Sequence, residues 1–329
     1  MANVAVIGTG TWSLALACLL CDNGHKVKMW SESEEKSKAL AATRRYELLE
    51  GLVIPDSIEF FTDYEKTLDG ADFVLIGVAS PFVRRVAKGI APFVKDGEII
   101  LNVAKGIEEE TLMFPDAQIL DEIPNANVAI LSGPSHAEEV SKRIPTTCVV
   151  GAKDEKTAKY LQDIFMSETF RVYTSPDILG MEIGASLKNV IALAAGIADG
   201  LGYGDNTKAA LITRGLAEIG RLGIAMGCKK ETLYGLTGIG DLIVTCASMH
   251  SRNRRTGILL GQGKSLEDSM AEIGMAVEGV YSAKAAKKLA EKYGVEMPII
   301  EEVNKILFEG KQASEALKDL MLRDRRAES

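Results

Sequence analysis

Residues 4–23 read VAVIGTGTWSLALACLLCDN, in which a β-rich run, a glycine turn and a second apolar run follow one another. The first run predicts a buried strand over residues 4–7, and the second predicts a helix over residues 12–23. Gly8 permits a tight turn, and Gly10 lets the backbone approach a pyrophosphate at the N-terminus of the helix. This order is typical of dinucleotide-binding folds, so we expect a dinucleotide here. The alternative is an ordinary strand-to-helix turn with incidental glycines.

Short β-rich runs and helical patterns continue to alternate along the next part of the chain. Strands are expected at residues 26–30, 73–78, 98–103, 128–131, 146–150 and 170–173, and helices at residues 34–50, 82–93 and 155–165. This alternation predicts a doubly wound parallel sheet of the Rossmann type. From about residue 176 the strand signals stop, and helices are expected at residues 178–199, 207–226, 266–273, 282–293 and 299–307. We therefore predict an α/β dinucleotide-binding domain over residues 1–178 and an all-α domain over residues 179–329.

The composition is that of an ordinary globular protein. Of the 329 residues, 47% are hydrophobic and 26% are charged, which excludes disordered and fibrous classes. With 38 Lys and Arg against 46 Asp and Glu, the net charge of −8 opposes non-specific binding to nucleic acids or anionic membranes. The N-terminus lacks the basic region of a secretory signal, and no apolar run approaches the roughly 18 residues of a membrane span. We therefore expect a cytoplasmic protein in which a local basic cluster meets any bound anion.

The five cysteines and three histidines show no metal-ligand or catalytic spacing. Cys18 and Cys21 form a C-x-x-C pair that lies on one face of the first expected helix. Such a pair serves redox chemistry or packs in the core, and its apolar surroundings favour core packing. The sequence thus predicts no metal site.

An acidic residue follows the second expected strand. Glu32 lies at about the spacing from the glycine turn at which a carboxylate binds the adenosine ribose hydroxyls of NAD. No Arg or Lys lies between residues 30 and 35 to meet the 2′-phosphate of NADP, although Ser31, Ser33 and Lys36 leave that cofactor open. Glu32 therefore favours NAD over NADP.

Lys188 is the one charged residue in the apolar stretch 183–198, IGASLKNVIALAAGIA. In a helix its neighbours three and four positions away are glycine, alanine and isoleucine, so the ammonium is expected on a buried face. Burial lowers the pKa of a lysine and suits it to exchange protons with an alcohol or a carbonyl. The alternative is a lysine that extends to the surface. The pattern favours the functional interpretation.

Two further polar residues lie where the expected fold binds ligands. Lys105 follows the strand at residues 98–103, at the carboxyl edge of the sheet, and either faces a ligand or is a solvated loop lysine. Asp241 follows Gly238-Ile239-Gly240, which lacks the preceding strand of a second nucleotide loop. Its carboxylate is expected to bond a substrate hydroxyl or to hold a lysine in place, and the alternative is a helix N-cap.

Ser251-Arg252-Asn253-Arg254-Arg255 is the basic cluster that an acidic protein needs to bind an anion. Arginine binds phosphate or carboxylate through two parallel hydrogen bonds. The cluster is therefore a candidate anion site, with a solvated basic turn as the alternative.

Five motifs in a fixed order resemble the bacterial type of NAD(P)-dependent glycerol-3-phosphate dehydrogenase. They are Gly8-Thr9-Gly10-Thr11-Trp12, Leu131-Ser132-Gly133-Pro134-Ser135-His136-Ala137, Ser186-Leu187-Lys188-Asn189-Val190, Gly238-Ile239-Gly240-Asp241-Leu242 and Ser251-Arg252-Asn253. The resemblance extends from residue 4 to about residue 310 and implies a Rossmann domain followed by an all-α domain. It also implies hydride transfer between sn-glycerol 3-phosphate and NAD or NADP, with dihydroxyacetone phosphate as the oxidised product. The family is usually a cytoplasmic homodimer that supplies glycerol 3-phosphate for phospholipid synthesis.

The resemblance also implies roles for individual residues, with Lys188 as the catalytic lysine that transfers the proton. The substrate would contact Lys105, Gly133, Ser135, Lys188, Asp241, Ser251, Arg252 and Asn253, the last two at its phosphate. The cofactor would contact Thr11, Trp12, Lys105, Ala137, Arg252 and Glu278, in addition to Gly8, Gly10 and Glu32. Two residues depart from the family pattern. Ser13 replaces a glycine and leaves less room for its helix to pack on the strand, but the binding site is expected to survive. Glu32 replaces a basic or imidazole side chain, which puts a preference for NADP in doubt.

Two other functions fit parts of the pattern. A related β-hydroxyacid or sugar-acid dehydrogenase shares the Rossmann domain and the helical lysine, but Ser251-Arg252-Asn253 favours a phosphorylated triose. A regulator that senses NAD(H) without turnover needs no buried Lys188 beside an anion-binding cluster, and the chain shows no basic surface for nucleic acid.

Overall fold

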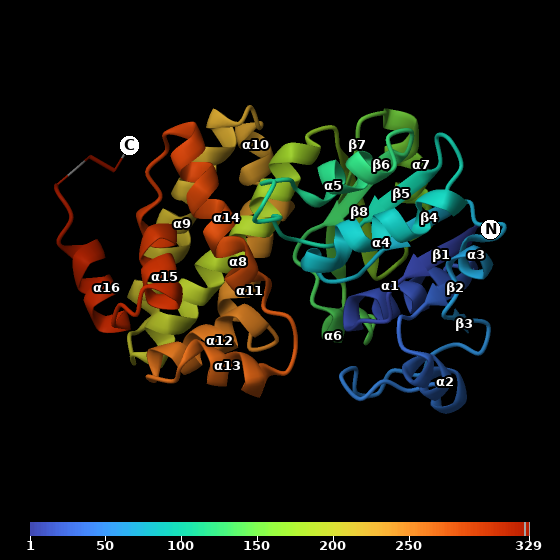
Figure 1. The fold of residues 1–329 in the computed structure, drawn as a ribbon, viewed down its shortest axis with the longest axis horizontal. Helices are drawn as coiled ribbons and strands as arrows, with labels where there is room; N and C mark the ends of the chain where they lie inside the picture. The colour runs from blue at the N-terminus through green and yellow to red at the C-terminus, as the bar shows by residue number, and fades with distance from the viewer. Residues whose placement is uncertain (326, 329) are drawn as a thin grey trace. The chain divides into compact units, whose positions relative to one another are not determined.

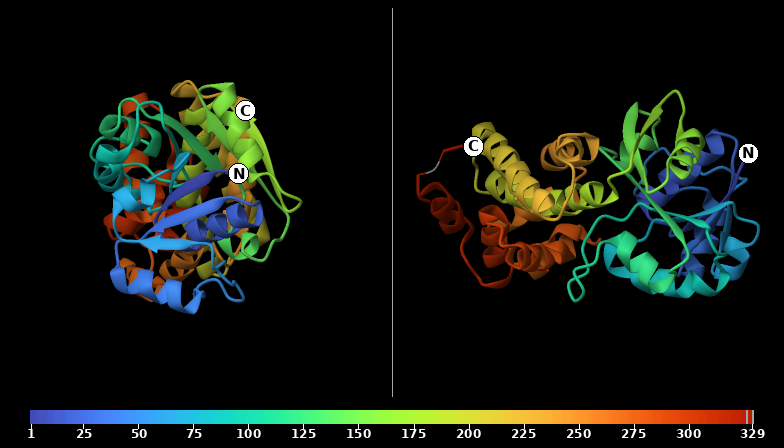
Figure 2. Two further views of the ribbon diagram at one scale, coloured as in Figure 1. Left: turned by 90° about the vertical axis from the view of Figure 1, so that its right-hand side faces the viewer. Right: turned by 90° about the horizontal axis from the view of Figure 1, so that it is seen from above.

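The computed structural model describes the whole chain except residues 326 and 329. Figure 1 and Figure 2 show an α/β part and an all-helical part. The chain forms two compact units. The first comprises Met1–Lys105 and Met113–Glu182, and the second comprises Gly106–Leu112 and Ile183–Ser329. The short segment Gly106–Leu112 thus belongs to the helical unit. The two predicted domains, residues 1–178 and 179–329, place this segment in the α/β domain instead.

An eight-stranded sheet forms the centre of the first unit, in the order β3-β2-β1-β4-β5-β6-β7-β8. The strands are β1 (Asn3–Ile7), β2 (Lys26–Trp30), β3 (Glu59–Phe61), β4 (Phe73–Ile76), β5 (Ile99–Asn102), β6 (Asn127–Ser132), β7 (Thr146–Ala152) and β8 (Phe170–Ser175). All neighbours run parallel except β6 and β7. The first six strands have the Rossmann order 3-2-1-4-5-6, so the predicted doubly wound sheet is confirmed. The sequence interpretation missed β3 and the antiparallel pairing of β7.

Helices cover both faces of this sheet (Figure 1). They are α1 (Thr11–Asp22), α2 (Glu34–Thr43), α3 (Tyr64–Leu68), α4 (Val83–Ile90), α5 (Pro115–Glu122), α6 (Ala137–Val140) and α7 (Glu155–Phe165). Val4 and Val6 of β1 pack in one core with α1 and α7, whereas Ala5 and Ile7 pack in a second core with α4 and α5. Burial on both faces explains why residues 4–7 of this strand are all apolar.

One helix of the first unit ends earlier than predicted. The pattern predicts a helix over residues 34–50, but α2 ends at Thr43 because Arg44 adopts a left-handed conformation with φ 51°. The Arg44 guanidinium donates hydrogen bonds to the carbonyls of Pro55 and Ile58 at 3.2 and 2.8 Å. These partners lie 11 and 14 positions away, so the local pattern does not reveal the turn.

The second unit is helical and includes α8 (Ile178–Gly200) from Ile183 onward. The others are α9 (Asp205–Ala225), α10 (Lys230–Leu233), α11 (Asp241–Ala247), α12 (Arg252–Gly261), α13 (Leu266–Ile273), α14 (Glu278–Tyr293), α15 (Pro298–Phe308) and α16 (Ala313–Met321). An 18-residue window of the 23-residue helix α8 has a mean hydropathy of 1.4, so by length and composition alone this helix could span a membrane. Yet 94% of its apolar window is buried inside the protein, which accounts for its composition.

Helices α8 and α12 cross at paired glycines. A Cβ atom on Gly257 would lie 2.3 Å from the carbonyl oxygen of Leu193 and 2.9 Å from the Cα atom of Gly196. The two backbones therefore touch with no side chain between them. This crossing fixes the position of α12, which begins at Arg252, against the helix that carries Lys188.

We expect Gly257→Ala to lower the free energy of unfolding by about 1–3 kcal/mol, because the added methyl group forces two packed backbones apart. Gly220→Ala in α9 is the matched control, since a Cβ atom there meets nothing within 4 Å. Alanine favours a helix over glycine by roughly 0.5–1 kcal/mol, so the control is expected to be neutral or stabilising. Urea unfolding measures both variants, and equal losses would contradict the close crossing.

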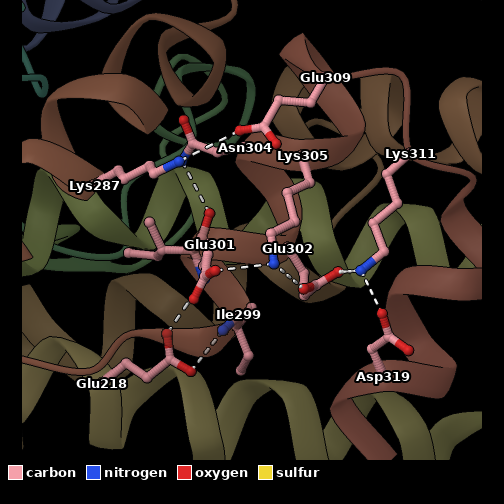
Figure 3. A network of polar contacts seen from close by, with 11 residues as sticks. Glu218, Lys287, Ile299, Glu301, Glu302, Asn304, Lys305, Glu309, Lys311 and Asp319 are labelled. Atoms are coloured by element: carbon pink, nitrogen blue, oxygen red, sulfur yellow. Dashed lines mark hydrogen bonds and ion pairs between the residues drawn. The ribbon is translucent and has the colours of Figure 1, made fainter.

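A network of ion pairs joins α15 to α16 (Figure 3). Glu302 of α15 has 7% of its surface exposed and pairs with Lys305 at 2.9 Å and with Lys311. Lys311 also pairs with Asp319 of α16 at 2.6 Å. Two ammonium groups thus compensate the burial of one carboxylate.

Glu218 of α9 binds the N-terminus of α15 (Figure 3). Its two carboxylate oxygens accept hydrogen bonds from the backbone N–H groups of Ile299 and Ile300 at 2.8 and 3.3 Å. Burial raises the pKa of Glu218 to about 7, and these N–H groups only partly oppose that rise. A glutamate that titrates near neutral pH therefore accepts the hydrogen bonds of the buried N-terminus of α15.

The raised pKa makes the folded protein hold a proton that the unfolded chain releases, so this group's contribution to stability is lost as the pH rises toward 7. We expect the free energy of unfolding of the wild type to fall by about 2–3 kcal/mol relative to Glu218→Gln between pH 5 and pH 8. Urea unfolding across this range measures the difference. Exposed Glu291→Gln is the control and should follow the wild type, whereas parallel curves for Glu218→Gln would contradict the prediction.

Candidate functional site

The first glycine turn lies between β1 and α1, as the sequence predicts. Gly8 has φ +118°, and a Cβ atom there would lie 2.9 Å from the carbonyl oxygen of Gly77, so the position requires glycine. Gly10 precedes α1 in an extended conformation, and a Cβ atom there meets nothing within 4 Å. This N-cap offers no side-chain acceptor to the first turn of α1, which begins with Thr11 and Trp12. Open space beside uncapped N–H groups fits the pyrophosphate of a dinucleotide.

Ser13 does not crowd α1 against the sheet. The Ser13 hydroxyl is buried and donates a hydrogen bond to the carbonyl oxygen of Gly77 at 2.7 Å. A Cβ atom on Gly77 would lie 2.2 Å from the Ser13 oxygen, so the missing side chain at position 77 makes the room. The two residues are 64 positions apart, which is why the local motif does not show the compensation.

Glu32 lies just beyond the carboxyl end of β2, at the edge of the sheet where Rossmann folds bind the adenosine ribose. Its carboxylate forms a two-pronged ion pair with the guanidinium of Arg85 in α4, with N–O distances of 2.9 and 3.0 Å. Residues 30–35 contain no Arg or Lys, so the local sequence does not indicate Arg85 as the basic partner. The two residues of the pair are 53 positions apart.

Lys105, Gly133 and Ser135 lie together beyond the carboxyl ends of β5 and β6. The carbonyl oxygen of Gly133 accepts hydrogen bonds from the Lys105 ammonium at 3.3 Å and from the Ser135 hydroxyl at 3.0 Å. Lys105 is half-buried rather than a fully solvated loop lysine, and Ala137 begins α6 just after this loop. The structure thus brings three of the predicted substrate residues together at the edge of the sheet that binds ligands.

Lys188 lies in the middle of α8 with 6% of its surface exposed, so it does not extend to the surface. Its ammonium donates hydrogen bonds to Asp241 Oδ1 at 2.5 Å and to Thr245 Oγ1 at 2.7 Å. Both partners come from α11, which the residues around Lys188 could not reveal. Of the roles considered for Asp241, the structure shows the one that holds a lysine, whereas the N-cap of α11 is Gly240. The carboxylate favours the ammonium form and so works against the effect of burial.

Thr245 is a site residue that the sequence interpretation missed. Its oxygen accepts the hydrogen bond from Lys188, and its hydroxyl donates to the backbone carbonyl of Asp241 at 2.6 Å. Because the hydroxyl proton is directed to that carbonyl, the oxygen presents a lone pair to the ammonium. The only signal in the sequence is that Thr245 lies four residues after Asp241, on the same helix face.

The arginines of the basic cluster have different surroundings. Arg254 forms an ion pair with Asp199 of α8 at 2.7 Å and donates a hydrogen bond to the carbonyl of Ala247 at 2.7 Å. Arg252 begins α12, and within the described part of the chain its guanidinium forms no ion pair or hydrogen bond. Ser251 caps α12 by accepting a hydrogen bond from the Arg254 backbone N–H at 3.1 Å. The cluster is therefore a capped helix start in which Arg252 has charge available for an anion.

Asn253 and Glu278 belong to a hydrogen-bond network beside Lys188. The amide of Asn253 donates to Asn189 Oδ1 at 2.9 Å, and its oxygen accepts from the backbone N–H of Gly279 at 2.8 Å. Asn189 in turn donates to Glu278 at 3.5 Å. This network ties the first turns of α12 and α14 to α8. The predicted residues of the second unit are thus brought together around one helix.

The cysteines are free thiols in this structure. Burial raises the pKa of Cys18 to about 12, which keeps it protonated and unreactive. Cys18 is a buried residue of α1, and Cys21 on the same helix packs against the core that Cys18 joins, which supports core packing over redox chemistry. Across the residues that the structure describes, no group of three or more His, Cys, Asp and Glu side chains is arranged to hold a metal ion.

A Rossmann sheet is followed here by a helical unit that holds a buried lysine. These features define a dinucleotide-dependent oxidoreductase. Two family models agree with this class. Residues 3–158 match the N-terminal model, and residues 177–318 match the C-terminal model, of NAD-dependent glycerol-3-phosphate dehydrogenase. The chain therefore belongs to this family, and the resemblance seen in its five motifs is confirmed.

Individual members of the family are similar to this chain over nearly their full length. The chain is 59% identical to an NAD(P)+-dependent glycerol-3-phosphate dehydrogenase of Agathobacter rectalis, over 100% of this chain and 98% of the relative. It is 55% identical to the enzyme of the same name from Fusobacterium nucleatum, over 100% of this chain and 99% of the relative. A crystal structure of glycerol-3-phosphate dehydrogenase from Coxiella burnetii superposes with a TM-score of 0.94 at 35% identity, covering 98% of this chain and 99% of that one.

Proposed function

We propose that this protein is an NAD(P)-dependent oxidoreductase that interconverts sn-glycerol 3-phosphate and dihydroxyacetone phosphate. The observation that carries the proposal is the buried Lys188, held by Asp241 and Thr245 in a unit that also presents the guanidinium of Arg252, which forms no ion pair with any residue that the structure describes. Reduction of a phosphorylated ketone requires a proton donor for the carbonyl oxygen and a cation for the phosphate. The family membership supports the same reaction.

In the direction of reduction, C2 of dihydroxyacetone phosphate accepts a hydride and its carbonyl oxygen accepts a proton. When bound, NADH or NADPH would supply this hydride. The Lys188 ammonium gives its proton to the oxygen, and in the reverse direction the neutral amine takes the proton back. Asp241 and Thr245 hold the lysine nitrogen in place, and Arg252 anchors the phosphate, so that substrate binding energy aligns the reacting carbon.

The other residues are assigned roles through their match to the family motifs. For the substrate these are Lys105, Gly133, Ser135, Asp241, Ser251, Arg252 and Asn253. For the cofactor they are Gly8, Gly10, Thr11, Trp12, Glu32, Lys105, Ala137, Arg252 and Glu278. The open glycine turn and the hydrogen bonds of Gly133 support these two sets.

The family likeness also supports a cellular setting. We propose that the protein acts in the cytoplasm as a homodimer and supplies glycerol 3-phosphate for phospholipid synthesis. Sedimentation of the purified protein tests the dimer, and a single species at the 35.4 kDa mass of one chain would contradict it.

The activity is tested by mixing the protein with dihydroxyacetone phosphate and following the loss of NADH or NADPH absorbance. We expect rapid oxidation with the phosphorylated ketone and little with dihydroxyacetone, which lacks the group that Arg252 would bind. Equal rates with both ketones would contradict the anion site. Turnover of a β-hydroxyacid alone would favour a related dehydrogenase, and cofactor binding without any turnover would favour the sensor.

A further inference from the structure

The pair of Glu32 and Arg85 lies where the sheet meets the adenosine end of a dinucleotide. Rossmann proteins distinguish NAD from NADP at this position, because an acidic residue binds the ribose hydroxyls and an arginine accommodates the 2′-phosphate. Here the structure brings both kinds of side chain together, with N–O distances of 2.9 and 3.0 Å.

The ion pair is exposed and therefore open to exchange with a ligand. The Arg85 side chain is 58% exposed and the Glu32 side chain is 66% exposed. An exposed pair contributes little to stability because water screens the two charges. A phosphate dianion carries more charge than a carboxylate and matches the same guanidinium fork, so it can take the place of Glu32.

Other side chains near Glu32 are engaged elsewhere. Ser31 accepts a hydrogen bond from Thr9 at 3.2 Å, Ser33 caps α2, and the Lys36 ammonium contacts the hydroxyl of Tyr46 at 3.2 Å. None of the three contacts the Glu32 carboxylate in this structure.

Arg85 is oriented by its own helix as well as by Glu32. Its guanidinium lies 5.1 Å from the ring centre of Phe82, which precedes α4 and is itself exposed. An aromatic ring on one face restricts the guanidinium while its edge N–H groups remain directed outward. The neighbouring Arg84 differs, because it pairs with Asp121 and Glu122 of α5.

We propose that Arg85 binds the 2′-phosphate of NADP(H), and that Glu32 binds the ribose hydroxyls of NAD(H) while keeping Arg85 in place. The two side chains then form one exchangeable site for both cofactors. This inference rests on the dinucleotide binding of the proposed function, but it does not depend on which substrate is reduced. It also changes the expectation from the sequence, in which Glu32 alone favours NAD.

The test is a fluorescence titration with NADPH and with NADH in the absence of substrate, since the two probes differ only in the 2′-phosphate. We expect Arg85→Ala to weaken NADPH binding by about 10- to 100-fold, the usual effect of losing a charge-assisted contact, and to change NADH binding by less than about threefold. Glu32→Gln should strengthen NADPH binding and weaken NADH binding, because the carboxylate no longer competes with the phosphate. This second variant keeps the test valid if Arg85→Ala does not fold.

Lys88→Ala is the matched control, because it removes an exposed positive charge from the same helix. The ratio of the two affinities should stay at the wild-type value in this variant. An unchanged ratio in Arg85→Ala, or an equal loss for both cofactors, would overturn the proposal. An Arg85-dependent preference in a protein that does not reduce dihydroxyacetone phosphate would support this inference and contradict the proposed function.

Discussion

Replacing Lys188 by alanine is expected to lower kcat for reduction of dihydroxyacetone phosphate by about 10²–10⁴-fold, the usual contribution of a positioned acid or base. The substrate phosphate and the cofactor would still be bound by other residues, so KM should change far less. Steady-state kinetics with saturating NADH measure both parameters. A kcat near the wild-type value would remove this lysine from the mechanism.

The structure shows why this variant needs a control for folding. Truncation of Lys188 leaves the Asp241 carboxylate buried without its counter-charge, which typically costs about 3–5 kcal/mol of stability. Lys188→Arg keeps a positive charge opposite Asp241, but a guanidinium does not release a proton at neutral pH. We therefore expect the arginine variant to be more stable than the alanine variant and equally poor in kcat. Recovery of kcat in Lys188→Arg would indicate an electrostatic role in place of proton transfer.

Arg252→Ala is expected to raise KM for dihydroxyacetone phosphate by about 10- to 100-fold, because a charge-assisted contact to the phosphate is lost. Its stability should stay close to that of the wild type, since within the described residues the guanidinium forms no ion pair or hydrogen bond. Arg254→Ala, two positions along α12, is the matched comparison. It removes the ion pair with Asp199 and should lower the free energy of unfolding by about 1–3 kcal/mol.

Substrate kinetics and urea unfolding on both variants separate these effects. A change in KM confined to Arg252→Ala, and a loss of stability confined to Arg254→Ala, would support the assignment of Arg252 to the phosphate. The reverse result would show that the wrong arginine was assigned to the anion.

The fold was predictable from the sequence where its signal is local. Uniformly apolar strands such as β1 are recognised by composition, and the helix at Glu155–Phe165 was predicted with the observed bounds. The edge strand β3 has no such apolar run, because it is only three residues long and each of them is half-buried or exposed. The early end of α2 depends on the contacts of Arg44 with a later loop. The strand β3 and the end of α2 were therefore missed because long-range contacts define them.

The site was predictable to a similar extent. Lys188 stands out because one charge in an apolar helix requires a partner, and the partner proved to be Asp241. Thr245 and Arg85 were missed because each acts through a residue far away in the sequence. The room for Ser13 was not visible in the sequence for the same reason, since the distant Gly77 supplies the space that it needs.

The most direct test of the proposed reaction follows the hydride itself. The protein is incubated with dihydroxyacetone phosphate and NADH deuterated at both C4 positions of the nicotinamide, and the product is analysed by mass spectrometry. We expect sn-glycerol 3-phosphate with one deuterium on C2 and a proton from water on the adjacent oxygen. Product without deuterium, or no glycerol 3-phosphate from folded protein that binds NADH, would contradict it.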